Sequence, residues 1–472
     1  MSNKFSLGFS TLDKEISIEK LTITGRLPAW LSGTLIRNGP ARFEVGDIKM
    51  RHWFDGFSML HAFSFAQGQV SYVNKFLESQ AYQYARDKGK IGYAEFATDP
   101  CRSIFQRFTQ IFSPSFTDNA NVNISKLADK YVALTELPLP IEFNPQTLET
   151  LGVIKYADAL PGITTTAHPH YDFSKKESLN FLTNFSAQST YNLYRLPDHS
   201  ATRELVSSIP TDAPSYMHSF ALTENYLVLV EYPFVVNLFS LLLSGQPFIE
   251  NYQWQPERGA RFLVVSRKDG KLVGNCKSEA FFAFHHINAF ENENEITLDI
   301  SAYPDASVIE KLYLDILRGE TDKELPRLGE LRRYHINLET SAVKYEVMSA
   351  EPIELPRINY QLANTKKYHF VYGVGSDKNN PNNFLDRLVK IDLQDKNVQI
   401  WHQNDCYPGE PVFIPSPNAI KEDEGVIMSV VLNVQKGNSF LLVLDASSFT
   451  ELARAEVPHH IPFGFHGQFY QV

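Results

Sequence analysis

Four histidines in similar surroundings are candidate metal ligands. They are His168 in TAHPHYD, His218 in PSYMHSF, His285 in FFAFHHIN and His466 in FGFHGQF. Each lies in a strand-like or turn-like segment beside aromatic and small residues, where an imidazole can be held away from solvent. Their separations match no local metal motif such as HExxH, and the chain has 14 histidines, so a hydrogen-bonded core role is also open. A set of imidazoles without thiolates suits Fe(II), Zn, Cu or Ni.

Neutral ligands would leave the charge of a metal dication uncompensated, so we expect carboxylates that accept the second N–H of each ligand. Three acidic residues in apolar settings are candidates: Glu136 in ALTELP, Glu354 in PIELPRINY and Glu410 in YPGEPVF. Each could also be an ordinary surface or loop acid.

The segments that would position these residues are mostly short strands. Runs of β-branched and aromatic residues are bounded by Gly, Pro, Asn, Asp or Ser, as is typical of strands. They cover 52–65, 131–136, 178–186, 190–196, 225–232, 261–267, 295–303, 332–339, 369–375, 387–393, 425–432 and 439–446. Helical patterns are few, with 99–112 and 307–319 the clearest.

Many short strands without alternating helices predict a closed or radial all-β architecture such as a propeller, in which inner strands would bring distant ligands to one axis. We find no sequence repeat and no linker, so we expect one domain over 1–472.

Composition narrows the function classes. The net charge is −10 and the basic residues are scattered, which makes nucleic acid an unexpected partner. Three widely spaced cysteines and an N-terminus without an apolar signal core predict a cytoplasmic protein. No run reaches the roughly 18 apolar residues of a spanning helix. The most apolar stretch, 232–248, is predicted to be either a buried helix or an in-plane membrane contact.

Ten motifs in order along the chain resemble the carotenoid cleavage oxygenase family. The likeness is strongest to the animal-type branch, which includes β-carotene oxygenases and the retinal pigment epithelium isomerohydrolase. In DPCRSIF, Arg102 stands where that branch usually has Lys. The motifs are GTLIRNGP, HWFDGFSMLH, TDNANVN, TAHPHYD, PSYMHSF, FHHIN, ELPRINY, PGEPVF, SFTELARAEV and FHGQF.

The resemblance implies a seven-bladed propeller capped by loops and helices, with a non-haem Fe(II) on its axis. It also implies that Val122, in TDNANVN, faces the open coordination side. Transferred to this sequence, the iron ligands are His168, His218, His285 and His466, the carboxylates paired with three of them are Glu136, Glu354 and Glu410, and His170 and His286 are structural neighbours.

The implied reaction is dioxygenase cleavage of a conjugated C=C bond by O₂, with β-carotene split at its central 15,15′ bond to retinal as the leading substrate. Alternatives are eccentric carotenoid cleavage, cleavage of apocarotenoids or stilbene-like phenolics, retinyl ester isomerohydrolysis without O₂, and a non-enzymatic scaffold or carotenoid carrier. The metal motifs do not separate the enzymatic alternatives, because substrate choice depends on the shape of the tunnel. The 34 Phe and 22 Tyr residues could line such a tunnel, although filling a large β core explains most of them.

The resemblance further suggests peripheral, monotopic membrane association around the tunnel mouth. The expected patch combines two segments. It consists of Phe105, Phe108, Ile111 and Phe112 with Val235, Val236, Leu238, Phe239 and residues 241–243.

Overall fold

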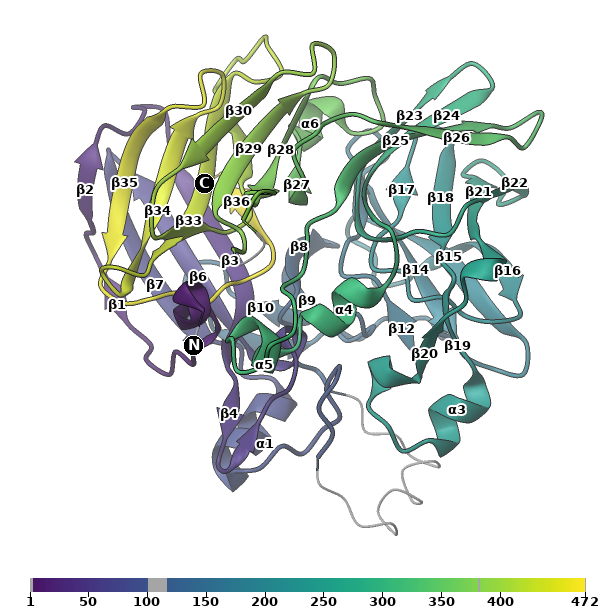
Figure 1. Cartoon of the computed structure of the whole chain (residues 1–472), viewed down its shortest axis with the longest axis horizontal. Coiled ribbons are helices and arrows are strands. Elements are labelled where there is room, and N and C mark those ends of the chain that lie inside the picture. Colours follow the sequence, from purple (N-terminus) through teal and green to yellow (C-terminus); the bar gives the residue numbers. More distant parts are fainter. Residues whose placement is uncertain (1–2, 101–116, 381–382, 472) are drawn as a thin grey trace.

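A computed structural model describes residues 3–100, 117–380 and 383–471. Seven antiparallel sheets of four to six strands are arranged in a ring (Figure 1), and two short two-stranded ribbons are added to them. This arrangement confirms the predicted seven-bladed propeller. We number the sheets blade 1 to blade 7 in the order in which the chain passes through their main strands.

The strands follow the chain from blade to blade, and their bounds are these. Blade 1 contains β1 (Ser17–Ile18), β7 (Gln69–Phe76), β6 (Phe57–Ala66), β3 (Gly33–Arg42) and β36 (Gly467–Tyr470). Blade 2 contains β8 (Asn123–Leu127), β9 (Lys130–Leu134), β10 (Ile141–Phe143) and β11 (Thr150–Val153), and blade 3 contains β12 (Thr164–Thr165), β13 (His170–Asp172), β14 (Glu177–Asn184), β15 (Ser189–Pro197) and β16 (Glu204–Thr211). Blade 4 contains β17 (Ala221–Leu222), β18 (Tyr226–Glu231), β21 (Ala260–Ser266) and β22 (Leu272–Ser278), and blade 5 contains β23 (Phe282–Asn292), β24 (Glu295–Tyr303), β25 (Glu330–Asn337) and β26 (Val343–Val347).

The last two blades complete the ring. Blade 6 contains β27 (Glu354–Arg357), β28 (Phe370–Gly375), β29 (Arg387–Asp392) and β30 (Val398–His402). Blade 7 contains β2 (Thr22–Gly25), β31 (Cys406–Pro408), β32 (Val412–Pro415), β33 (Gly425–Asn433), β34 (Asn438–Asp445) and β35 (Glu451–Val457). The two ribbons are β4 (Glu44–Val45) with β5 (Ile48–Lys49), and β19 (Phe234–Val236) with β20 (Tyr252–Trp254).

Segments from the two ends of the chain close the ring between blades 1 and 7. Strand β2 pairs with β35, so that Thr22 lies opposite Glu456. Strand β36 pairs with β3, so that Thr34 lies opposite Tyr470. Neither of these two blades is therefore built from one continuous stretch of chain.

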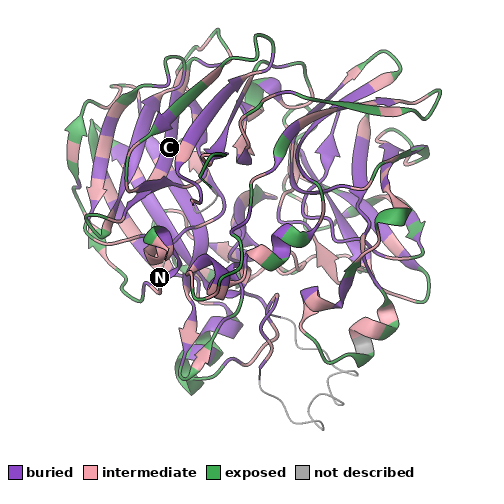
Figure 2. Cartoon of the chain, viewed as in Figure 1, coloured by how far each residue is buried: buried purple, intermediate pink, exposed green. Residues whose placement is uncertain are grey.

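The predicted strands are confirmed to within a few residues, except that the run over 52–65 begins with a 3₁₀ turn at Trp53–Asp55 and becomes a strand only from Phe57. The prediction over 295–303 coincides with β24, whose residues Ile296, Leu298 and Ile300 are fully buried. Burial is concentrated in the strands, whereas the connecting loops at the rims are exposed (Figure 2). The strand sequences are therefore apolar because the faces of neighbouring blades pack against one another.

Helices are few and short: α1 (Gln80–Lys88), α3 (Leu238–Leu243), α4 (Ser307–Lys311), α5 (Leu314–Leu317) and α6 (Tyr360–Ala363), with 3₁₀ turns η1 (Lys4–Phe9), η2 (Trp53–Asp55), η3 (Phe248–Asn251) and η4 (Pro256–Arg258). The helix predicted over 307–319 is present as α4 and α5, with a break at Leu312 and Tyr313. The helix predicted over 99–112 lies outside the described residues from position 101 onward.

The stretch 232–248 is not the single buried helix that was one of its two predicted forms. It begins with strand β19, in which Val235 and Val236 are buried, and continues into α3. On α3, the side chains of Phe239 and Leu243 are 76% and 73% exposed. Val235 and Val236 therefore cannot belong to a surface patch, which corrects that part of the expected membrane contact.

Two further observations concern the whole described chain. Cys276 and Cys406 are buried free thiols. None of the helices in residues 3–100, 117–380 and 383–471 is long and apolar enough to cross a bilayer.

Candidate metal centre

The structure brings the four predicted histidines together from four blades. His168 lies between β12 and β13, His218 precedes β17, His285 is on β23, and His466 directly precedes β36. One nitrogen of each ring lies within 4.8 Å of the corresponding nitrogen of the other three. The Nε2 atoms of His168 and His218 are 3.0 Å apart, and those of His285 and His466 are 3.2 Å apart. Ring nitrogens separated by up to 181 positions therefore face one point.

The remaining three blades each place one predicted carboxylate against a histidine. The Nδ1 atom of His218 lies 2.6 Å from Glu136, which follows β9 in blade 2. The Nδ1 atom of His285 lies 2.5 Å from Glu354, the first residue of β27. The third pair joins Nδ1 of His466 to Glu410, between β31 and β32, at 2.7 Å. Each Nδ1–H can donate to its carboxylate, and this fixes the tautomer in which Nε2 is a free lone pair.

His168 is held differently from the other three histidines. In the part of the chain that the structure describes, no carboxylate accepts a hydrogen bond from its ring. Its backbone N–H donates to the Thr166 hydroxyl at 3.0 Å. Thr166 in turn donates to the backbone carbonyl of His218, so the hydroxyl connects two of the four histidine segments.

Irregular strands aim two of these side chains at the centre. Strand β23 loses its regular register on both sides of His286, next to His285. Strand β27 loses its register between Glu354 and Arg357. Bulges of this kind turn side chains out of the regular alternation. As a result, Glu354 reaches His285, while Arg357 reaches Glu410 at 3.4 Å.

Tyrosines and arginines that sequence reasoning did not identify hold the carboxylates. The hydroxyls of Tyr216 and Tyr303 each donate at 2.8 Å, to Glu136 and Glu354 respectively. Tyr216 lies in the histidine motif PSYMHSF, whereas Tyr303 lies at the end of β24, away from any histidine motif, and nothing in the sequence alone specifies their partners.

Glu410 instead contacts two cations. The guanidinium groups of Arg37 and Arg357 both contact its carboxylate, and the backbone N–H of Gly467 donates to it at 3.0 Å. Burial alone would raise the pKa of Glu410, but the two arginines and His466 lower it to about 2. Burial also acts to raise the pKa of Glu354. The charge of His285 and the hydrogen bond from it outweigh this effect, and the pKa of Glu354 is lowered. Both groups are therefore carboxylates at neutral pH.

His168 and His466 are kept neutral by their surroundings. Burial, with a further contribution from the neighbouring histidines, lowers the pKa of His168 well below its ordinary value. Burial lowers the pKa of His466 to about 4 even though Glu410 opposes the shift. Neutral imidazoles with converging lone pairs are the form in which histidine binds a metal. Among the described residues the donor set is all nitrogen, with no thiolate in the group, and it thus fits a borderline divalent metal such as Fe(II).

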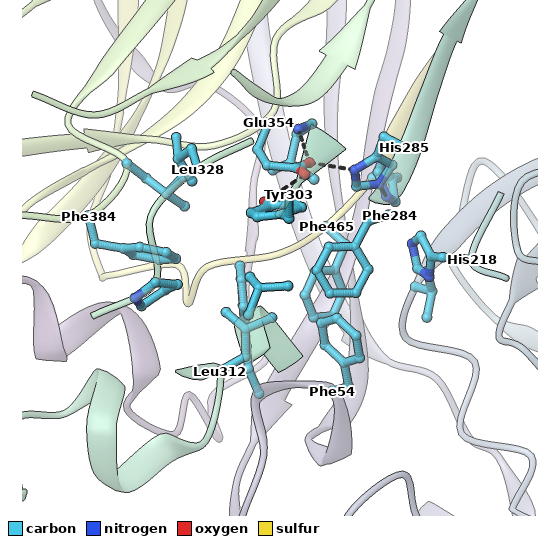
Figure 3. A pocket seen from close by; sticks show the side chains of 17 residues that line it. Phe54, His218, Phe284, His285, Tyr303, Leu312, Leu328, Glu354, Phe384 and Phe465 are labelled. Atoms are coloured by element: carbon cyan, nitrogen blue, oxygen red, sulfur yellow. Dashed lines mark hydrogen bonds and ion pairs between the residues drawn. The ribbon is translucent and has the colours of Figure 1, made fainter. Parts of the chain in front are cut away.

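An apolar cavity adjoins the histidines (Figure 3). It contains about 60 Å³ of free space, enough for a few small molecules but far less than a carotenoid needs. Val122, which was expected to face the open coordination side, is among its lining residues. The labelled apolar residues around it are Phe54, Phe284, Leu312, Leu328, Phe384 and Phe465.

The two histidines predicted to be structural neighbours make other contacts. His170 lies 2.9 Å from the hydroxyl of Tyr360 and 2.9 Å from the carbonyl of Phe220. His286 lies 2.7 Å from the hydroxyl of Ser219. Burial lowers the pKa of His170 to about 4 and that of His286 to about 3, so both are neutral.

Known proteins are similar to this chain in sequence and in fold over nearly its whole length. A family model described as retinal pigment epithelial membrane protein matches residues 9–471. The mitochondrial carotenoid-cleaving dioxygenase of Mustela putorius furo is 35% identical, over 98% of this chain and 96% of that protein. The β,β-carotene 15,15′-dioxygenase of Gallus gallus is also 35% identical, over 95% of each chain. The cobalt-substituted apocarotenoid oxygenase of Synechocystis superposes with a TM-score of 0.87 at 27% identity, over 99% of this chain and 98% of that one.

Proposed function

Because this chain belongs to the carotenoid oxygenase family of the retinal pigment epithelial membrane protein and the carotenoid-cleaving dioxygenases, we propose that it is a non-haem Fe(II) dioxygenase acting on a carotenoid. The proposed reaction splits β-carotene at its central 15,15′ bond and gives retinal. The observation that carries the proposal is the convergence of four histidine ring nitrogens beside an apolar cavity.

His168, His218, His285 and His466 would hold the iron. Bound Fe(II) would supply the activation of O₂, chemistry for which protein side chains alone have no equivalent. The protein's part is to keep the four Nε2 atoms deprotonated and oriented. The carboxylates of Glu136, Glu354 and Glu410 do this by accepting the Nδ1–H groups of three of the ligands.

The cavity residues would orient the polyene and exclude water. Phe54 stacks on His218 with ring centroids 6.3 Å apart, and Phe284 lies edge-on to the same ring at 5.4 Å. Rings at these positions can pack against a conjugated chain close to the histidines. The small free volume means that substrate entry requires wall side chains to move. A polar side chain in the cavity wall would weaken the binding of a hydrocarbon substrate, because its polar group would be desolvated without gaining a hydrogen bond.

Product analysis of the iron-loaded protein with β-carotene in detergent, under ¹⁸O₂ and in parallel without oxygen, tests the proposal. Retinal labelled at the new carbonyl as the sole product is the expected result. Long apocarotenals with ionone-type products would instead assign eccentric cleavage. Turnover of retinyl ester under nitrogen would replace the proposal with isomerohydrolysis.

We further propose that α3 forms a peripheral membrane contact through which an insoluble substrate reaches the protein. Phe239 and Leu243 support this, since large apolar side chains on one short helix are strongly exposed. Asn237 caps this helix by accepting hydrogen bonds from the backbone N–H groups of Phe239 and Ser240, which holds it in place at the surface. The residues of the expected patch at 105–112 lie outside the described part of the chain.

A further inference from the structure

A second cavity, a surface groove, lies against the wall of the metal cavity. It contains about 810 Å³, within the range of small-molecule sites. Its sides come from the residues before η2, from the β19–β20 ribbon with η3, and from α4 and α5. In Figure 1, the ribbon and the two short helices face each other on the same side of the ring.

The segment carrying α4 and α5 separates the groove from the metal cavity. Val308 and Leu312 line the metal cavity, whereas Ile309 and Tyr313 line the groove. A helix of one or two turns has little stability of its own. Because the metal cavity is too small for a carotenoid, a substrate that lay across both cavities would have to displace side chains of this partition.

A chain of aromatic rings spans this separation. The ring of Tyr313 lies 5.1 Å from that of His52, which lies 4.8 Å from that of Phe54. Phe54 in turn lies 6.3 Å from His218. Only three ring-to-ring steps therefore connect the groove with a histidine of the metal centre, a separation that suits an elongated substrate lying across both cavities.

The groove combines an aromatic side with a polar cluster. Phe234, Tyr252 and Trp254 provide the aromatic surface. Two side chains contact Glu250. Arg51 forms an ion pair with its Oε1 atom at 2.8 Å, and the Tyr313 hydroxyl donates to the same atom at 2.9 Å. The other oxygen, Oε2, accepts no hydrogen bond from any residue in 3–100, 117–380 or 383–471.

We propose that this groove holds one end of the substrate and that Glu250 and Arg51 select an end ring that carries a hydroxyl group. The hydroxyl donates to the free Oε2 of Glu250 and accepts from the Arg51 guanidinium, which is 48% exposed. The hydrocarbon part of the ring packs on the aromatic side. This inference rests on the proposed function and refines its substrate range: β-carotene remains a substrate, and its counterpart with a hydroxylated end ring is turned over with the higher kcat/KM.

A competition assay with the iron-loaded protein tests the selection. A carotenoid bearing a hydroxyl on each ring is compared with the unsubstituted carotenoid of the same chain length. The ratio of their kcat/KM values should favour the hydroxylated compound. It should fall about tenfold in Glu250→Ala, as expected for one hydrogen bond to a charged group. Glu257→Ala is the matched control, because this exposed acid lies seven positions away and does not line the groove.

Binding to the metal-free protein separates the two proposals. The difference in tryptophan quenching between the native chain and Trp254→Phe reports on a ligand in the groove. If neither carotenoid is cleaved but Glu250→Ala still weakens quenching by the hydroxylated compound, the selection stands and the proposed function fails. If both are cleaved and the ratio is unchanged in Glu250→Ala, the selection is wrong and the proposed function stands.

Discussion

The Nδ1 atom of His466 lies 2.7 Å from Oε1 of Glu410, and the same carboxylate contacts the guanidinium groups of Arg37 and Arg357. Of the three histidine–carboxylate pairs, this one alone includes cations among the partners found in the described residues. The negative charge of Glu410 is thus shared between a histidine and two arginines. Its removal would leave the buried guanidinium of Arg37 and the partly buried one of Arg357 without their carboxylate beside the metal centre.

The first prediction compares carboxylates with different surroundings. Glu410→Gln should lower iron affinity more than Glu136→Gln, because only the former exposes the metal to uncompensated arginines. Loss of such a carboxylate typically costs about 10- to 100-fold in metal affinity. Titration against a chelator of known affinity measures this. Equal losses in the two variants would show that the arginines do not influence the metal.

The second prediction concerns the ligands themselves. His218→Ala and His466→Ala should each abolish both iron binding and turnover, because each removes one of the converging Nε2 atoms. His170→Ala is the matched control, since this half-buried histidine lies outside the converging group and contacts Tyr360. Iron content by elemental analysis and the cleavage assay should agree. Retention of both in His218→Ala or His466→Ala would rule out the assigned site.

The third prediction is the pH at which iron is lost. Burial lowers the pKa of His466 from its ordinary 6.5 to about 4 and that of His168 well below 6.5. Protons therefore compete with the metal only when the pH approaches the lowered values. Because the pKa values of these two histidines are lower in the folded than in the unfolded protein, their contribution to folding stability is complete above the pKa of the unfolded state. It is lost as the pH falls through the pKa of the folded state.

Iron content should accordingly stay constant from about pH 8 to about pH 5 and fall towards pH 4. Dialysis at graded pH followed by elemental analysis measures it, with circular dichroism to identify unfolding. Half-loss of iron near pH 6.5 from a folded protein would mean that the histidines titrate as ordinary surface imidazoles.

The fourth prediction concerns α3. Phe239→Asp together with Leu243→Asp should reduce binding to liposomes severalfold, because the two side chains would no longer bury apolar area in the interface. The control is Ile420→Asp, which changes a side chain that is 91% exposed in blade 7. Liposome flotation provides the measurement. Equal binding by both variants and the native chain would exclude α3 as the contact.

The fifth prediction addresses the contact between blades 6 and 7. Lys390 on β29 donates to Asp423 at 2.8 Å and to the carbonyls of Ala446 and Ser447 at 2.8 and 2.9 Å. Lys390→Ala should destabilise the protein by about 3 to 5 kcal/mol, because it leaves the buried Asp423 without its cation. Thermal unfolding measures the change, with the exposed Lys396→Ala as control. A melting temperature as high as that of the control would show that Asp423 regains water or another partner.

The sequence predicted strands well because each strand has a local signature of apolar residues between turn formers. It also identified the four histidines and three glutamates that the structure places together, although chemistry alone left core and surface roles open for them. The partners of these residues were not predictable. Arg37 and Glu410 are 373 positions apart, and only the closed ring makes them neighbours.

The stretch 232–248 shows the opposite difficulty. Its composition is apolar throughout, but Val235 is buried in a strand whereas Phe239 is exposed on a helix. Apolar composition alone does not predict whether a side chain faces the core or the solvent, because that depends on which other segments of the chain pack against it. The polar cluster around Glu250 was missed for a related reason, since Arg51 and Tyr313 reach it from two other blades.

Closure of the ring by β2 and β36 also sets the order of assembly. His466 directly precedes β36, so the fourth nitrogen reaches the centre only when this strand pairs with β3. A nascent chain that has not yet delivered this segment offers three histidines and lacks the partner of Glu410. Tight metal capture would therefore have to follow the pairing of β36 with β3, and a bound ion would then oppose reopening of the ring by mass action.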